Sequence, residues 1–301
     1  MNPYSNLKII VCIPAYNEAK NIVRVVERAA AYCSEVIVCD DGSIDGTSDA
    51  ARTGGATVIQ HSVNKGYGAA IKTLFNAARK MNADVLVTID SDGQHNPDQI
   101  PSLINPILTN KADIVIGSRF IMKSDQEQVP IYRAIGIKAI TKLTQIISYD
   151  EITDAQSGFR AYSKKALSSI ELKEEGMAVS AEILVRAKDH GLRIDEVPVT
   201  ITYAVEDAST QNPISHGLGI VVAIVKFVSI KHPLAFYGLP GLAFLILAAV
   251  FAGDVTAYFA NGKNVPTNIL ILAIGSALMG LILVITGTIL YSLAGIRKAY
   301  R

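Results

Sequence analysis

The sequence has no tryptophan, almost no net charge and few cysteines, and these scarcities limit what the chain can be. Its 301 residues carry 28 Lys and Arg against 27 Asp and Glu, a formal net charge of +1. We therefore expect no nucleic-acid partner, because the phosphates of nucleic acids usually require a strongly basic face. Cys12, Cys33 and Cys39 lack metal-ligand spacing, which favours reduced core residues of a cytosolic domain.

Charged residues are also missing from two long C-terminal stretches. Residues 234–253 and 269–296 contain none, and about 20 apolar residues are enough to cross the hydrocarbon core of a bilayer. We predict a membrane region at 233–301 with two transmembrane helices at about 234–253 and 269–293. The apolar segment 214–232 predicts an interfacial helix leading into them, or alternatively a core helix of the soluble part.

The flanking charges predict the orientation of this hairpin. Lys226 and Lys231 precede it, a basic tail at 297–301 follows it, and its loop carries only Lys263, balanced by Asp254. The positive-inside rule then places both ends in the cytoplasm. Because the N-terminus shows no signal-peptide pattern, we expect the domain at residues 1–213 to be cytoplasmic and the protein to be a multi-pass protein of the cell membrane.

Residues 1–213 alternate short apolar runs with helical patterns such as those at 19–31 and 69–81. This alternation predicts an α/β fold with a mostly parallel sheet covered on both faces. The β-rich runs lie at 7–13, 35–39, 56–60, 84–89 and 113–116.

Polar residues follow each of these runs. In open α/β sheets ligands bind beyond the carboxyl ends of the strands, so these residues together predict one site. Any single pair, such as Asp41-Gly42, is also ordinary turn chemistry. The polar groups are Asn17-Glu18, Asp40-Asp41, Asn64-Lys65, Asp90-Ser91-Asp92 and Arg119.

Asp90 and Asp92 stand two residues apart after the fourth run. If the extended backbone continued there, both carboxylates would project on one face. Two carboxylates together with substrate phosphates suit Mg²⁺ or Mn²⁺, which would offset the charge of a leaving diphosphate. Gln94 is expected to add or orient a ligand, and His95 to be a loop residue.

The other polar groups near these carboxylates suggest a nucleotide. Glu18, Asp40 and Asp41 come one or two strands away, within reach of a nucleoside's hydroxyl and base donors. We expect Lys65 and the backbone around Gly66 and Gly68 to approach phosphate oxygens, although the Gly66-Tyr67-Gly68 fragment alone is a weak signal.

A second set of candidates is cationic and comprises Arg119, Arg133 and Arg160. Residues 131–147 fit a helix on which Arg133 falls on the apolar side. A guanidinium beside an apolar stripe suits a lipid phosphate, although a salt bridge or a snorkelling side chain is the alternative. No Ser-His-Asp or Cys-His arrangement is evident, and a phosphate acceptor needs no strong general base.

The motifs together resemble those of the family-2 glycosyltransferases, in particular the dolichyl- and polyprenyl-phosphate mannose or glucose synthases. The resemblance covers roughly residues 7–205. It implies a GT-A fold, transfer of mannose or glucose from GDP-mannose or UDP-glucose to a polyprenyl phosphate, and inversion at the anomeric carbon. The motifs are Pro14-Ala15-Tyr16-Asn17-Glu18, Asp40-Asp41-Gly42-Ser43, Asp90-Ser91-Asp92-Gly93-Gln94-His95, Gly117-Ser118-Arg119 and Asp154-Ala155-Gln156-Ser157-Gly158-Phe159-Arg160.

The chemistry of the residues and the family resemblance together predict three sets of site residues. The donor set is Pro14, Tyr16, Asn17, Glu18, Asp40, Asp41, Lys65, Asp90 and Ser91. The metal set is Asp90, Asp92 and Gln94. The catalytic and acceptor-side set is Asp92, Arg119, Arg133, Asp154 and Ser157. Glu182 matches an acidic helix residue of the family.

One departure from the family and several rival functions remain. Relatives usually carry a basic stretch after the last strand, whereas residues 202–217 contain no Lys or Arg, so diphosphate neutralisation would depend on the metal and Lys65.

A processive synthase is disfavoured because its Gln-x-x-Arg-Trp motif needs a tryptophan, and a nicotinamide dehydrogenase is disfavoured because the glycine fingerprint is missing. The alternatives are transfer of a single sugar to another lipid or glycan, and a non-catalytic sugar-nucleotide-binding membrane protein. The oligomeric state is left open, with a homo-oligomer as one outcome.

Overall fold

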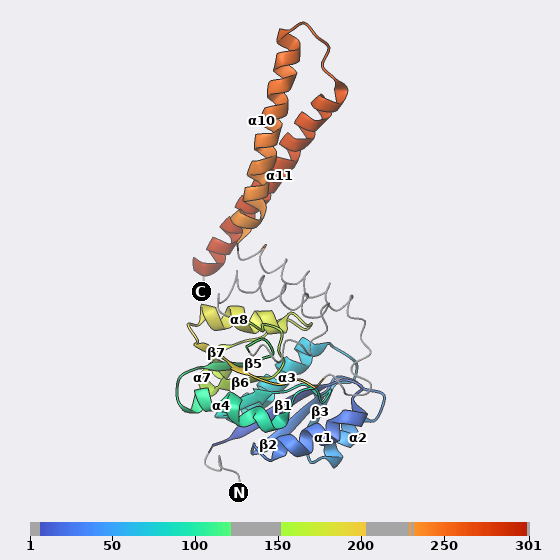
Figure 1. Ribbon diagram of the computed structural model, residues 1–301, viewed down its shortest axis with the longest axis vertical. Coiled ribbons are helices and arrows are strands. Elements are labelled where there is room, and N and C mark those ends of the chain that lie inside the picture. The colour runs from blue at the N-terminus through green and yellow to red at the C-terminus, as the bar shows by residue number, and fades with distance from the viewer. Residues whose placement is uncertain (1–6, 122–151, 203–228, 230–231, 300–301) are drawn as a thin grey trace. The chain divides into compact units, whose positions relative to one another are not determined.

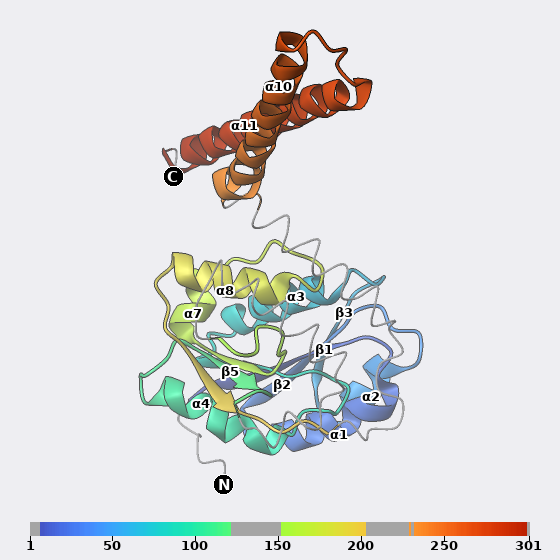
Figure 2. The same cartoon turned by 45° about the horizontal axis from the view of Figure 1, so that its top comes forward.

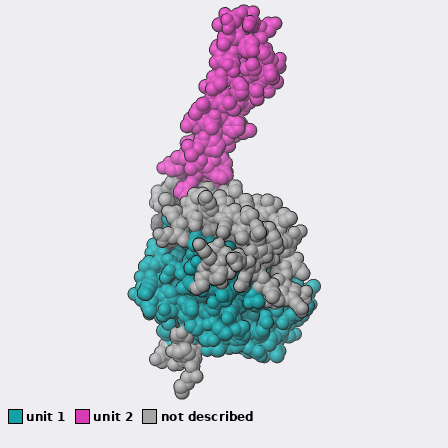
Figure 3. Space-filling view, viewed as in Figure 1, with its two compact units in different colours: residues 1–224 teal, residues 225–301 magenta. Residues whose placement is uncertain are grey.

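A computed structural model describes residues 7–121, 152–202, 229 and 232–299 of the chain. The chain divides into two compact units, residues 1–224 and 225–301, which Figure 3 colours separately. The first unit contains a seven-stranded sheet in the order β3-β2-β1-β4-β6-β5-β7. The strands are β1 (Ile9–Ala15), β2 (Glu35–Asp40), β3 (Thr57–Gln60), β4 (Val85–Thr88), β5 (Ile114–Ser118), β6 (Arg160–Ser163) and β7 (Ile194–Pro198).

The sheet is parallel except at β6. Strand β6 lies between β4 and β5 and runs antiparallel to both, with Arg160 opposite Thr88 and Ser163 opposite Val85. The start of β6 therefore lies at the same edge of the sheet as the carboxyl end of β4. The predicted α/β fold with a mostly parallel sheet is confirmed, and β6 and β7 add to the five strands that the sequence indicated.

Helices cover both faces of this sheet, as Figures 1 and 2 show. Helices α1, α2 and α4 pack on one face and α3, α7 and α8 on the other. The helices are α1 (Ala19–Ala30), α2 (Thr47–Thr53), α3 (Tyr67–Lys80), α4 (Ile100–Leu108, preceded by the 3₁₀ turn η1, Pro97–Gln99), α7 (Lys164–Ser169) and α8 (Val179–Asp189).

Side-chain alternation explains why β1 has no polar face. Ile9, Val11 and Ile13 point into the core shared with α1 and α4, whereas Ile10 and Cys12 point into the core shared with α3 and α8. Successive residues of a strand face opposite sides, so a central strand covered by helices must be apolar throughout. The continuous apolar run at the start of the sequence is thus explained by its central place in the sheet.

The second unit consists of two long apolar helices. The π-helical turn η2 (Leu234–Gly238) leads into α10 (Leu239–Ala260), and α11 (Thr267–Ala299) follows. The segments Leu234–Ala260 and Thr267–Leu293 are each long and apolar enough to cross a membrane. Most of their large apolar side chains are exposed, as for Leu242 and Ile282. Such exposure suits contact with lipid better than burial in a soluble core.

Two glycines bring α10 and α11 into backbone contact. A Cβ atom at Gly241 would lie 3.0 Å from the carbonyl oxygen of Gly280, and one at Gly280 would lie 2.8 Å from the carbonyl oxygen of Gly241. Apolar side chains gain little by leaving lipid for each other, so helices in a bilayer associate through close packing at small residues. The hairpin is therefore held at a point where neither residue can be enlarged.

Several sequence-based expectations fall outside the described residues. They include the amphipathic helix at 131–147 with Arg133, the interfacial helix at 214–232 except Ser229 and His232, and the cations Lys226 and Lys231. These stay predictions. The boundary between catalytic and membrane regions predicted at about residue 213 likewise stays a prediction.

We predict that Leu74→Ala lowers the free energy of unfolding of the first unit by about 2–5 kcal/mol, because it removes a buried side chain and leaves a cavity. Leu74 of α3 is 0% exposed, whereas Leu108 at the end of α4 is 37% exposed. Thermal unfolding of the detergent-solubilised protein measures the effect, and Leu108→Ala serves as the matched control. Equal losses for both variants would contradict the described core.

Candidate active site

A cavity of about 420 Å³ lies at the carboxyl ends of the central strands. Its wall combines the loops after β1, β2 and β4 with residues from the segment before β6 and from the start of α8. The sheet thus brings together side chains that are far apart in the sequence. The predicted site residues that line it are Pro14, Tyr16, Glu18, Asp41, Asp90, Ser91 and Asp92.

Asp41 fixes the loop between β3 and α3. One of its carboxylate oxygens lies 2.6 Å from His61 Nδ1 and accepts the backbone N–H of Lys65 at 3.0 Å, while the other accepts the N–H of Gly66 at 2.7 Å. Asp41 is only 3% exposed. Its carboxylate therefore shapes the wall of the cavity at the same time as it contributes to it.

Three residues of the predicted donor set do not line the cavity. Asp40 is fully buried, and its carboxylate accepts the backbone N–H of Ser43 at 2.9 Å and the hydroxyl of Ser48. The side-chain oxygen of Asn17 accepts the N–H of Ile44 at 3.0 Å. These contacts hold the loop after β2 in shape, and the side chain of Lys65 is exposed.

Glu18 faces the cavity with an altered acidity. Burial raises its pKa, an Asn21 hydrogen bond opposes that rise, and the negative charges of Asp92, Asp45 and Asp90 add to it. A carboxyl with a raised pKa protonates more readily than a free one and can then donate a hydrogen bond.

Asp90 is held tightly in place. The hydroxyl of Tyr67 donates to one carboxylate oxygen at 3.2 Å, and Nε2 of His95 lies 3.6 Å from the other. Burial acts to raise the pKa of Asp90, but the neighbouring His95, Tyr67 and Arg119 outweigh it and keep the pKa below its usual range. The backbone of Gly158 lies against both oxygens, since a Cβ atom there would clash with them.

Asp92 reaches the same cavity by a different route from the predicted one. The expectation of a continuing extended backbone is wrong, because β4 ends at Thr88 and residues 91–93 form a turn. In this turn Asp92 Oδ1 accepts the backbone N–H of Gln94 at 3.0 Å. Asp90 and Asp92 still line one cavity, whereas the side chain of Gln94 is not part of its wall.

His95 lies between β4 and η1, as the loop prediction has it, but it is buried. It is 5% exposed, pairs with Ile201 in an isolated antiparallel bridge, and packs on the ring of Phe159 at 5.2 Å between centroids. The sequence offered only a histidine after a glycine-containing turn, so the burial that comes from this pairing was missed.

Asp154 and Arg119 form a two-pronged ion pair. Arg119 Nε donates to Asp154 Oδ2 at 2.5 Å, and Arg119 Nη2 donates to Asp154 Oδ1 at 2.7 Å. Asp154 is fully buried. Burial alone would raise the pKa of Asp154, but the charge and hydrogen bonds of Arg119 outweigh it, so the pKa lies below its usual range. The predicted phosphate-binding cation Arg119 is thus paired with the predicted acceptor-side acid.

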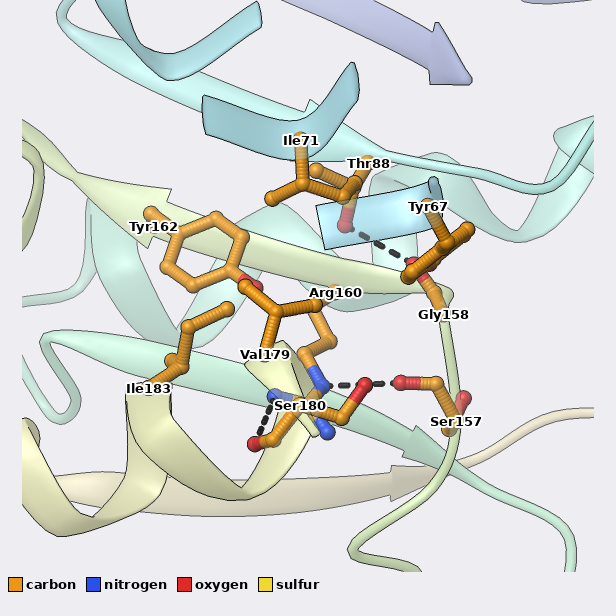
Figure 4. A pocket seen from close by; sticks show the side chains of 10 residues that line it. All are labelled: Tyr67, Ile71, Thr88, Ser157, Gly158, Arg160, Tyr162, Val179, Ser180 and Ile183. Atoms are coloured by element: carbon orange, nitrogen blue, oxygen red, sulfur yellow. Dashed lines mark hydrogen bonds between the residues drawn. The ribbon is translucent and has the colours of Figure 1, made fainter. Parts of the chain in front are cut away.

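The segment before β6 contributes Gln156 to the cavity wall, whereas the predicted acceptor-side residue Ser157 is not part of that wall. Ser157 is 1% exposed, and the carbonyl oxygen of Gly158 accepts the hydroxyl of Thr88 at 2.8 Å. Figure 4 shows the side chain of Arg160 between Ser157 of this segment and Ser180 of α8. The conformation that presses Gly158 on Asp90 is therefore held from two sides.

Comparison with known proteins identifies this arrangement. Residues 10–170 match the model of the family described as Glycosyl transferase family 2. The chain belongs to glycosyltransferase family 2. This glycosyltransferase is 31% identical to the UDP-N-acetylglucosamine–dolichyl-phosphate N-acetylglucosaminyltransferase of Methanococcus voltae, over 73% of this chain and 93% of the relative. It is 33% identical to the undecaprenyl-phosphate mannosyltransferase of Micrococcus luteus, over 64% of this chain and 83% of the relative.

Solved structures show the same fold. The glycosyltransferase matches the crystal structure of glucosyl-3-phosphoglycerate synthase from Mycobacterium tuberculosis, which contains Mn²⁺ and uridine-diphosphate-glucose, with a TM-score of 0.59 and 23% identity. The match covers 75% of this chain and 79% of that one. The soluble part therefore has the predicted GT-A fold.

The donor set of the glycosyltransferase fits a divalent cation that is shared with a substrate. Among the described residues, no cluster of three or more His, Cys, Asp or Glu side chains could hold an ion alone. Asp90 and Asp92 nevertheless line one cavity, and Mg²⁺ usually binds through one or two carboxylates plus substrate phosphates. The two carboxylates would hold such an ion together with a nucleotide, not as a permanent resident.

The sequence reasoning missed several residues of the cavity wall. Tyr67 was part of a Gly-Tyr-Gly fragment judged too weak to interpret, and Gln156 lay inside a quoted motif without a role. Met177 and Ser180 carried no signal, because their place depends on how α8 packs. Glu182 holds that region by accepting the backbone N–H groups of residues 173 and 174.

We predict that Gly158→Ala reduces kcat by about 100-fold or more, because the new methyl group would displace the Asp90 carboxylate and misplaced catalytic groups are costly. Gly253 of α10, where a Cβ atom meets nothing within 4 Å, provides the control Gly253→Ala away from the cavity. Steady-state kinetics of both variants measure the difference. Normal turnover by Gly158→Ala would contradict the close contact.

We predict that Asp154→Asn lowers the free energy of unfolding near pH 7 by about 3–5 kcal/mol, because the largely buried Arg119 loses the negative charge of its two-pronged ion pair. The pKa of Asp154 is depressed in the folded state. The wild type should therefore be more stable than Asp154→Asn at pH values above the pKa of Asp154 in the unfolded chain, about 4. This difference in stability should disappear as the pH falls through the lower pKa of Asp154 in the folded protein. Unfolding measured at pH 7 and pH 3 checks this, and a difference that grows on acidification would contradict it.

Proposed function

We propose that this glycosyltransferase moves a hexose from a nucleotide-sugar to a polyprenyl phosphate at the membrane surface, with inversion at the anomeric carbon. One observation supports it most: a single cavity collects the nucleoside-side loops and the carboxylates Asp90 and Asp92, in a chain that also carries two apolar helices able to cross a membrane. The names of the relatives, which act on dolichyl or undecaprenyl phosphate, support the same acceptor class.

On the donor side, we assign Pro14, Tyr16, Glu18 and Asp41 to the nucleoside and Ser91 to the donor phosphates. All five line the cavity. When bound between Asp90, Asp92 and the diphosphate, Mg²⁺ or Mn²⁺ would offset the charge that develops on the leaving group. This role gains weight because Lys65, the cation first expected there, is not part of the cavity wall.

In the proposed reaction, an oxygen of the acceptor phosphate attacks the anomeric carbon while the bond from that carbon to the diphosphate breaks. The products are a polyprenyl-phosphate sugar and a nucleoside diphosphate. A phosphate oxyanion is already nucleophilic near neutral pH, so alignment and charge compensation are the main requirements. Arg119 and Ser157 are proposed on the acceptor side together with Arg133, which lies outside the described residues.

The donor sugar and the orientation in the membrane extend this proposal. The sequence suggested GDP-mannose or UDP-glucose, and the name of the Methanococcus voltae relative adds UDP-N-acetylglucosamine to the candidates. The basic residues on both sides of the apolar helices support a cytoplasmic catalytic unit with both termini on that side. The cytoplasm is also where reduced cysteines such as Cys12 persist.

We predict that Asp92→Asn lowers transfer to polyprenyl phosphate by about 100-fold or more, since it removes charge that a cation on the leaving diphosphate requires. Membranes carrying each variant are incubated with radiolabelled GDP-mannose, UDP-glucose or UDP-N-acetylglucosamine, and the labelled lipid is extracted. Asp49 on the exposed face of α2 gives the matched control Asp49→Asn.

Binding of Mn²⁺ provides a second reading of the same prediction. Electron paramagnetic resonance should show tight Mn²⁺ binding to the wild type only when a nucleoside diphosphate is present, and weaker binding to Asp92→Asn. Label transfer that survives chelation of divalent metal would refute the cation's role. Absence of labelled polyprenyl lipid with every donor would refute the acceptor.

A further inference from the structure

One polar group in the cavity wall lacks a partner. Gln156 lines the cavity, and its side-chain nitrogen Nε2 is fully buried with no hydrogen-bond partner among the described residues. Buried polar groups are almost always hydrogen-bonded, so each exception calls for a physical explanation. Part of the Gln156 side chain lines the cavity while the nitrogen is enclosed. Because the terminal torsion of a glutamine has a broad energy well, a turn of the carboxamide would bring this nitrogen to an acceptor that a substrate in the cavity supplies.

The backbone on each side of Gln156 is fixed by a buried cation. Arg160 is 1% exposed, and its guanidinium donates to the carbonyl oxygens of Ala155 at 2.7 Å, Ser157 at 2.8 Å and Ser180 at 3.2 Å. Figure 4 shows Arg160 between the segment of Ser157 and the helix of Ser180. This strut places Gln156 and Ser180 on one wall of the cavity, in a conformation set before any ligand arrives.

The order of strands says which part of the donor this wall meets. The sheet runs β2-β1-β4-β6 through its centre. Asp41 follows β2, Tyr16 follows β1, Asp90 follows β4, and Gln156 precedes β6. A nucleotide-sugar has the same order of nucleoside, diphosphate and sugar. With the nucleoside at β1 and β2 and the diphosphate at β4, the sugar falls on the β6 side.

We propose that Gln156, with Ser180 beside it, is a specificity-determining residue that hydrogen-bonds a hydroxyl or acetamido oxygen of the donor hexose. A carboxamide both donates and accepts, so it can distinguish the orientation of a hydroxyl group. Arg160 is the positioning residue of this subsite. The inference rests on the proposed function only in taking the ligand to be a nucleotide-sugar.

The test measures sugar recognition without the acceptor. Isothermal titration of the detergent-solubilised full-length protein compares GDP-mannose with GDP, and UDP-glucose and UDP-N-acetylglucosamine with UDP, all with Mn²⁺ present. The wild type should bind one nucleotide-sugar more tightly than its nucleoside diphosphate. We call the ratio of these two affinities the sugar increment. In Gln156→Met, which keeps the length of the side chain but loses its hydrogen bonding, the sugar increment should fall about fivefold to tenfold, while the affinity for the nucleoside diphosphate stays unchanged.

Matched variants separate this role from a general loss of structure. Gln60 is exposed at the end of β3, and Gln60→Met should leave the sugar increment intact. Gln156→Glu keeps the shape and the acceptor oxygens but loses both N–H donors, and should lower the increment as Gln156→Met does. Deoxy donors add a sharper reading: the hydroxyl whose removal weakens wild-type binding should no longer matter in Gln156→Met.

Two outcomes overturn the inference. One is an unchanged sugar increment in both Gln156 variants, and the other is a wild type that binds every nucleotide-sugar no better than its nucleoside diphosphate. The proposed function is judged separately. If the increment depends on Gln156 but no polyprenyl lipid is labelled, the acceptor assignment fails and the subsite stands. If polyprenyl lipid is labelled but the sugar increment does not depend on Gln156, the acceptor assignment stands and the Gln156 subsite fails.

Discussion

The reversed direction of β6 is the constraint on which the rest of the site depends. Because β6 pairs antiparallel with β4, the segment that enters β6 meets the loop that leaves β4 at one edge of the sheet. That meeting places the backbone of Gly158 against the carboxylate of Asp90. A parallel strand in this position would have carried the same segment to the opposite edge. The place of Gln156 in the cavity wall, and of Gly158 behind Asp90, thus follows from one strand's direction.

The charges around the cavity are arranged unevenly, and this explains the part assigned to a cation. Asp41 is satisfied by His61 and two backbone N–H groups, and Asp154 by Arg119. The guanidinium of Arg160 donates to three backbone carbonyl oxygens and so orders the backbone around it. Asp90 and Asp92 line the cavity beside the expected diphosphate, together with Glu18, and added negative charge is unfavourable there without a counter-ion.

Much of the fold was predictable because its signals are local. The run at β1 is apolar on both faces, and a helix-spaced stripe follows in α1, which together specify a covered parallel strand. The loops after β1, β2 and β4 could be collected at one edge by the strand-end rule alone, which placed Asp41, Asp90 and Asp92 together. The burial of His95 depends on a bridge to Ile201, more than 100 residues later in the chain, and the role of Arg160 depends on the packing of α8. Such contacts leave no periodic trace in the sequence.

Under the proposed function, the apolar helix pair would also change how the enzyme meets its acceptor. A catalytic unit joined covalently to a membrane anchor shares a two-dimensional phase with any lipid substrate, and confinement of this kind raises effective concentration without any new contact. Encounter is then set by lipid molecules per unit area and by lateral diffusion, not by bulk concentration. The close approach of Gly241 and Gly280 joins α10 and α11 into one packed pair, so such an anchor would act as a single element instead of two independent helices.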